Sequence, residues 1–101
     1  MRTTTHPGEV LRAEFMAPNG VSINKLAGDL DIPVSRVSDI VNARRAVTAD
    51  TALRLATYFR TTPEFWLNLQ SAFELSRLRA DKGSEIVAAI REPARPFNVE
   101  S

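Results

Sequence analysis

Residues 34–42 combine short hydrogen-bonding side chains with one long cation at helical spacing. On a helical wheel, one sector carries the polar members Ser35, Arg36, Ser38, Asp39 and Asn42. An ordinary solvated face would more often be glutamate and lysine. Serine, arginine, aspartate and asparagine are instead side chains that make hydrogen bonds to base edges in the major groove. The pattern therefore favours Ser35, Arg36, Ser38 and Asp39 as base-reading residues.

Two arginines, Arg44 and Arg45, come directly after this segment. A chain that leaves a groove-bound helix passes the phosphate backbone at this point, and arginines there would contact phosphate. Taken alone, the pair would suit an ordinary solvated turn equally well. Beside the preceding pattern, phosphate contact is the better interpretation. We refer to residues 43–46 as the basic corner.

The elements that would position these residues are two short helices joined by a tight turn. The first helix is predicted to begin after the N-cap Ser22 and to run to Leu30, with apolar residues at the spacing of one buried face. The second is predicted from Pro33, as its first residue, to about Asn42. Asp31 and Ile32 form the turn, because the residue before a proline avoids the helical region. The buried face of the second helix is expected to hold Val34, Val37, Ile40 and Val41.

Further helices are predicted on both sides of this pair. His6-Pro7-Gly8-Glu9 resembles a helix start, with Val10, Leu11 and Phe15 as its buried face. The only histidine, His6, is expected to pack or to cap the helix rather than to bind a metal. Thr48 is expected to cap a helix that ends near Phe59, and Thr62 to cap a longer helix that ends near Ala80.

The longest helix carries more apolar surface than one core requires. Its residues Leu67, Leu75 and Leu78 occupy a second sector, on the side opposite to the Trp66 sector. Such a sector predicts a dimer interface. The alternative is that residues 84–91, following a turn at 81–83, fold back and cover the three leucines.

Composition limits the remaining possibilities. The chain has 101 residues, 44% of them hydrophobic and 25% charged, which is typical of one soluble domain. It has no cysteine and no apolar run near ~18 residues, so we expect no disulfide, no thiolate metal site, no membrane span and no signal peptide, and a cytoplasmic location. Residues 1–5 are expected to form a loose polar leader, and the tail after Pro93 is expected to be ordered only by contact with another molecule.

Charge is distributed slightly unevenly along the chain. Residues 1–60 contain eight lysines and arginines against six acids, and residues 61–101 contain five against six. A protein that binds nucleic acid without sequence preference is usually far more basic, since phosphate contacts supply most of that affinity. We therefore expect a dimer that binds a specific site, with modest affinity per subunit.

Three strings resemble the HigA-type antitoxins of the XRE-like helix-turn-helix class, which is also called the virulence-associated protein I family. These are HPGEVLRAEF, VSRVSDIVNARRAVTADTALRLATYF and TPEFWLNLQ, which together cover roughly residues 6 to 75. The resemblance implies an all-α, five-helix, lambda-repressor-like domain with a short C-terminal helical extension. The expected organisation is one domain over 1–101, with a helix-turn-helix core at 6–62. Residues 63–101 would serve dimer or toxin contact.

The same resemblance implies a function and assigns residues to it. A homodimer would bind a palindromic operator in its own promoter and neutralise a HigB/RelE-like ribonuclease toxin. Ser35, Arg36, Ser38 and Asp39 fall on the base-reading positions of the groove helix. Phosphate contacts fall on Ser22, Asn24, Arg44 and Arg45.

Three alternatives to this function remain open. A purely protein-binding module would keep the fold and use the apolar sector of the longest helix, with the basic corner idle, and it is compatible with DNA binding in an antitoxin. A free-standing XRE-type regulator would keep the same DNA-binding face but have no toxin partner. An enzyme would need chemical groups that this sequence does not offer: it has one histidine, no glycine-rich phosphate loop and no evident carboxylate pair. We therefore expect neither catalysis nor a cofactor.

Overall fold

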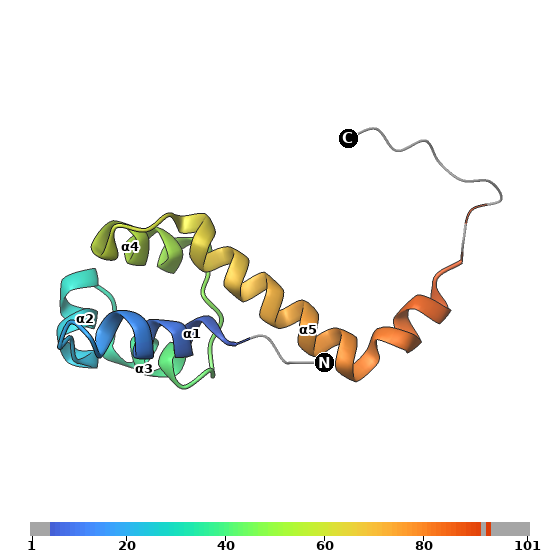
Figure 1. Cartoon of the computed structure of the whole chain (residues 1–101), viewed down its shortest axis with the longest axis horizontal. Coiled ribbons are helices and arrows are strands. Elements are labelled where there is room, and N and C mark those ends of the chain that lie inside the picture. Colours follow the sequence, from blue (N-terminus) through green and yellow to red (C-terminus); the bar gives the residue numbers. More distant parts are fainter. Residues whose placement is uncertain (1–4, 92, 94–101) are drawn as a thin grey trace.

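Helices form the framework of the part of the protein that the structure describes. The structure, a computed structural model, describes residues 5–91 and 93. In these residues a π-helical stretch, η1, follows the first of five α-helices and no strand is present (Figure 1). The elements are α1 (Pro7–Val10), η1 (Leu11–Met16), α2 (Ile23–Leu30), α3 (Val34–Val41), α4 (Ala49–Phe59) and α5 (Pro63–Ala89). The predicted all-α class and the helix-turn-helix pair are confirmed.

Side-chain caps determine where three helices begin. The hydroxyl oxygens of Ser22, Thr48 and Thr62 accept hydrogen bonds from backbone N–H groups three residues later, at 3.1, 3.4 and 3.1 Å. Each such cap contributes about 1 kcal/mol to stability. These three predicted starts are confirmed. The predicted start of α3 was wrong by one residue, because Pro33 is extended (ψ 146°) and serves as the N-cap.

The core lies where α2, α3 and α4 meet the base of α5. Each helix of the helix-turn-helix pair contributes one buried apolar face to this core, and Trp66 of α5 is fully buried. Its indole N–H donates to the Thr61 hydroxyl at 2.8 Å. The prediction for Val34 was wrong, since this side chain is 48% exposed. Val34 is the first residue of α3, and the buried face begins one turn later, at Val37.

The N-terminal helix changes its winding after Val10. In η1 the N–H of Ala17 donates to the carbonyl of Arg12 at 3.0 Å, five residues earlier. Because π-helical winding aligns residues five apart, Leu11 and Met16 are both buried on one side. The prediction that Leu11 is buried is confirmed, whereas Val10 and Phe15 are only half-buried and Met16 was missed.

Helix α5 is continuous from Pro63 to Ala89, so the predicted turn at 81–83 was wrong. A single glycine inside a helix costs only about 1 kcal/mol, and Gly83 therefore does not end it. Residues 84–89 stay helical and do not fold back to cover the leucines. Figure 1 shows that α5 changes direction in its orange C-terminal part and that this end lies away from the other helices. The expectations for residues 1–4 and for the tail after Pro93 fall outside the described residues. None of the helices within 5–91 combines the length and the apolar character that crossing a membrane requires.

Candidate nucleic-acid interface

The polar face of α3 lies opposite its buried face. Ser35 is exposed, and Ser38 and Asp39 are half-buried at the surface. The Arg36 side chain is 32% exposed. The structure therefore brings the four predicted base-reading residues onto one side of one helix. Figure 1 shows α2 and α3 side by side, at the end of the protein away from the free part of α5.

Asp39 is bound to the basic corner. Its carboxylate lies 3.0 Å from Nη2 of Arg44 and 3.5 Å from Nη2 of Arg45. The corner itself is a tight turn in which Ala43 has a φ of 60° and the N–H of Arg44 donates to the carbonyl of Asp39 at 2.7 Å. The two arginines are thus held beside the polar end of α3, where the sequence predicts phosphate contact.

Arg36 is bound to an acid that the sequence did not identify as part of the site. Its Nη1 lies 3.4 Å from the carboxylate of Asp50, in the first turn of α4. Arg54, one turn further along α4, donates to the same oxygen at 2.8 Å. That hydrogen bond is the main reason why the pKa of the Asp50 carboxyl is lowered, and the positive charges of Arg54 and Arg36 add to it. Asp50 therefore stays ionised and links the two arginines.

The N-terminus of α2 has the features of a phosphate contact. The Ser22 hydroxyl accepts from the N–H of Lys25, which leaves its own proton free to donate. Asn24 is exposed in the first turn. The first N–H groups of a helix lack intrahelical partners and favour a negative charge. These features support the assignment of Ser22 and Asn24.

Gln70 of α5 holds the residue that follows the basic corner, a contact that was not predicted from the sequence. The side chain is buried, and its Oε1 accepts from the N–H of Val47 at 2.8 Å. Its Nε2 donates to the carboxylate of Glu74 at 2.8 Å. The signal was present in the sequence, because Gln70 lies one turn from both Trp66 and Phe73 on the inner face of α5. Through Gln70, the long helix fixes the chain that follows the arginines.

His6 is a capping residue, as predicted. Its Nδ1 accepts from the N–H of Gly8 at 2.8 Å, and its ring lies edge-on to Phe73 with the ring centroids 4.8 Å apart. Burial lowers the pKa of His6, an effect that the nearby Glu74 carboxylate partly opposes. His6 thus joins the start of α1 to α5 in its neutral form.

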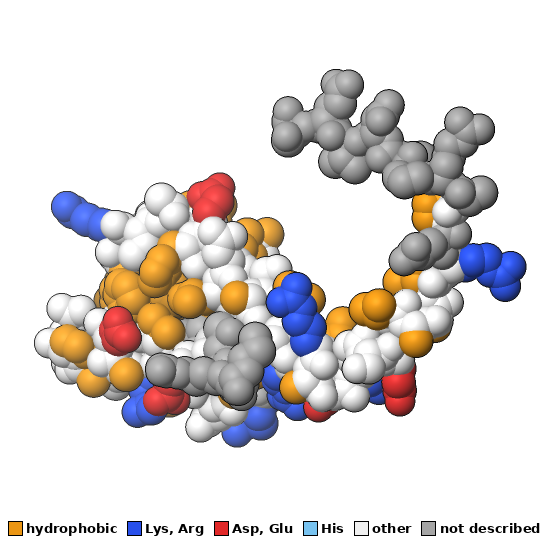
Figure 2. Space-filling view, turned by 45° about the vertical axis from the view of Figure 1, so that its right-hand side comes forward, with side chains coloured by type: hydrophobic (Ala, Val, Ile, Leu, Met, Phe, Trp, Pro, Cys, Tyr) orange, Lys and Arg blue, Asp and Glu red, His pale blue; other side chains and the backbone are white. Residues whose placement is uncertain are grey.

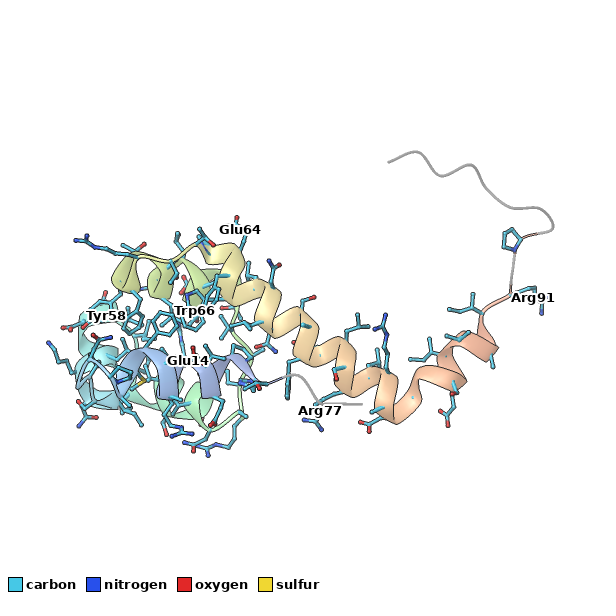
Figure 3. The ribbon with its side chains drawn as sticks, viewed as in Figure 1. Glu14, Tyr58, Glu64, Trp66, Arg77 and Arg91 are labelled. Atoms are coloured by element: carbon cyan, nitrogen blue, oxygen red, sulfur yellow. The ribbon has the colours of Figure 1, made fainter. Side chains whose placement is uncertain are left out.

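The three leucines predicted as an interface do not share one environment. Leu67 is partly buried and packs against the core. Leu75 and Leu78 are 46% and 45% exposed. Leu78 also lines a surface hollow together with His6 and the basic corner. Figure 3 shows the contrast along α5, with the Trp66 side chain among the helices and Arg91 beyond the far end. Figure 2 shows further hydrophobic side chains on the free part of the helix, and the exposed ones there include Ile86, Val87 and Ile90.

Known proteins resemble this chain over most of its length. The helix-turn-helix family model HTH_3 matches residues 12–66. Virulence-associated protein I of Dichelobacter nodosus is 45% identical over 96 residues, which are 94% of this chain and 87% of that protein.

Two solved structures share the fold closely. An addiction module antidote protein of the HigA family from Coxiella burnetii is 44% identical with a TM-score of 0.84, covering 91% of this chain and 100% of the other. The Pseudomonas aeruginosa antitoxin HigA, solved with the higBA promoter, is 41% identical with a TM-score of 0.84, covering 91% and 99%.

Proposed function

This chain belongs to the helix-turn-helix family, and on that premise we propose that it is a HigA-type antitoxin. As such it binds an operator in its own promoter, represses its operon and neutralises a HigB/RelE-like ribonuclease toxin. The observation that carries the proposal is the likeness, over nine-tenths of the chain, to an antitoxin solved with its promoter. The polar face of α3 has Arg44 and Arg45 at its C-terminal end and follows the helix that begins at Ser22 and Asn24, and this arrangement supplies the chemistry that such binding needs.

In this function α3 enters the major groove. Arg36 would donate two hydrogen bonds to guanine, because its planar guanidinium matches the acceptors O6 and N7. Ser35 and Ser38 would bond either donors or acceptors. Asp39 would accept from cytosine only by releasing the arginines that it now holds, so we assign it the weaker reading role.

Contacts with the DNA phosphates would hold α3 in the groove at two places. Arg44 and Arg45 lie at its C-terminal end, and Ser22 and Asn24 lie at the start of the helix before it. Phosphate contacts at both ends of the pair determine the orientation of the reading helix without adding sequence information. The chain acts by binding alone in this proposal and uses no cofactor.

A palindromic operator requires two copies. One short recognition helix covers few base pairs, and two half-sites are ~34 Å apart, about one helical turn. We propose that Leu75 and Leu78, with Leu67 at the edge, form the symmetric interface, because exposed apolar side chains of this kind are otherwise unexplained. The last turns of α5, with the exposed Ile86, Val87 and Ile90, would remain available for a toxin.

The test is binding to a labelled fragment of the DNA upstream of its own reading frame, with a salt titration. Specific retardation that random DNA does not reproduce supports the repressor. A short reading frame for a basic toxin should lie adjacent, usually upstream, and its product should co-purify with the chain and lose ribonuclease activity. If the protein binds the operator but no such reading frame lies adjacent, the chain is a free-standing regulator. Both activities would be exerted in the cytoplasm.

A further inference from the structure

The base-reading candidate with the longest reach, Arg36, is held by a neighbour on another helix. Its Nη1 lies 3.4 Å from the Asp50 carboxylate, and its side chain is only 32% exposed. An arginine side chain loses up to ~2 kcal/mol of rotamer entropy when it is fixed in one geometry. A contact that is made before DNA arrives would reduce that loss on binding.

Asp50 is itself held in place by a chain of hydrogen bonds. Nε of Arg54 donates to its carboxylate at 2.8 Å, and Nη1 of Arg54 donates to the carbonyl of Leu30 at 2.7 Å. Leu30 is the last residue of α2, directly before the turn that leads to α3. The chain of contacts therefore runs from the reading side of α3, through α4, to the turn of the helix-turn-helix.

This contact leaves the reading edge of the guanidinium available. Asp50 is bonded through Nη1 alone, so Nη2 and Nε of Arg36 have donors to offer to a base. The Asp50 side chain is 59% exposed, and its negative charge repels DNA phosphates. This charge beside Arg36 would therefore disfavour the pairing of Arg36 with a phosphate.

We propose that Asp50 is a positioning residue for sequence discrimination: it holds Arg36 in the orientation that reads a base and prevents it from pairing with phosphate. The inference rests on the proposed DNA-binding function and extends it to a residue outside the reading helix. Removal of the carboxylate should release Arg36 to the nearest phosphate. The chain would then bind DNA about as well, but would discriminate less between sequences.

The experiment compares wild-type protein with Asp50→Asn on three DNA probes. These are the operator, operators with one base pair changed at the position that loses discrimination in Arg36→Ala, and random DNA of equal length. For Asp50→Asn we expect discrimination at that position to fall about tenfold, within the range of one bidentate base contact. Affinity for random DNA should stay equal or rise. In the Arg36→Ala background, Asp50→Asn should cause no further loss of discrimination.

Asp29→Asn is the matched control, because it removes the same charge from an acid bound to Lys25 at 3.0 Å and to Tyr58 at 2.6 Å, without contact to α3. It should leave discrimination unchanged. Asp50 also favours the N-terminus of α4 electrostatically, and a merely structural role would change the unfolding midpoint and affect every DNA equally. Asp50→Glu, which keeps the carboxylate, should restore part of the discrimination.

Three results would overturn the inference. One is that Asp50→Asn loses affinity equally on all probes, and another is that it retains the wild-type discrimination. The third is that Asp50→Asn lowers discrimination equally in wild type and in the Arg36→Ala background. In each case wild-type preference for the operator would leave the proposed function intact. A wild-type chain without any preference would refute the function and the inference together.

Discussion

Gly8 of α1 lies against the backbone of Ile40 in α3. A Cβ built on Gly8 would stand 1.7 Å from the Ile40 carbonyl oxygen, far inside van der Waals contact. Since both elements there are rigid backbone, no side-chain rotation could relieve the overlap. The absence of a side chain at residue 8 is therefore what allows the first helix to pack against α3, the proposed reading helix.

Gly8→Ala should destabilise the protein by about 3 kcal/mol, because α1 must shift away from α3. Urea unfolding followed by circular dichroism measures the change. Gly28→Ala is the control, since a Cβ there meets nothing within 4 Å, and helix propensity should make it more stable by about 0.5–1 kcal/mol. Equal stability of both variants would contradict the close packing.

Stability should fall as the pH drops from about 7 to about 5. The depressed pKa of His6 means that the unfolded chain binds its proton first, near the ordinary value of about 6.5. The stabilisation is therefore complete above that value and is lost as the pH falls through the folded-state pKa. Protonation also removes the Nδ1 acceptor that caps Gly8.

His6→Asn retains a capping acceptor and does not titrate. Urea midpoints at several pH values, compared between this variant and wild type, isolate the histidine, which is the only one in the chain. A wild-type curve that stays parallel to the variant's would exclude His6 as the source.

Arg36→Ala should weaken operator binding by about 1–3 kcal/mol, the range for one base-reading contact, with little effect on stability. Fluorescence anisotropy on operator and random DNA measures both affinities. If the loss is as large on random DNA, Arg36 contacts phosphate rather than a base.

Arg44→Ala combined with Arg45→Ala should lower the slope of log K against log[salt] by roughly 2 per subunit, because each phosphate contact releases about 0.9 counterions. Arg79→Ala with Lys82→Ala removes two exposed cations from α5 and should leave the slope unchanged. An unaltered slope in the first variant would remove the basic corner from the interface.

Leu75→Glu should give a folded monomer with operator binding largely lost. Two glutamates near the symmetry axis would weaken the free energy of dimerisation by about 3 kcal/mol or more if both were desolvated. Light scattering reports the mass, and Leu53→Glu, at another exposed apolar residue, should stay dimeric. An intact dimer of the Leu75 variant would place the interface elsewhere, most plausibly at residues 84–90.

Local signals in the sequence were sufficient for the helix starts, since Ser22, Thr48 and Thr62 cap their own helices through contacts three residues away. They were not sufficient where cooperativity along a helix or tertiary packing decides the structure. Gly83 suggests a turn by itself, but the helix continues through it. Val34 fits the apolar sector, but the packed face starts one turn later.

The candidate site, too, could be predicted from the sequence only in part. Periodicity placed Ser35 and Arg36 on one exposed face, because both lie on a single helix. The contact between Arg36 and Asp50 spans 14 residues and arises only when α4 packs into place. Sequence spacing carries no trace of such a pairing, and Asp50 by itself has the appearance of a favourable acid in a first turn.

Because α5 is one continuous helix, the number of residues in it determines how the leucines are placed relative to α3. Each added residue lengthens an α-helix by ~1.5 Å and rotates everything beyond it by ~100°. Gln70 ties the base of α5 to the chain after the arginines, so an insertion between Gln70 and Leu75 would turn the leucine surface about a fixed reading face. Two copies joined by that surface would then meet the operator out of phase, with every DNA-contacting residue unchanged. In the proposed dimer, chains that differ in length over this stretch would therefore not share one half-site spacing.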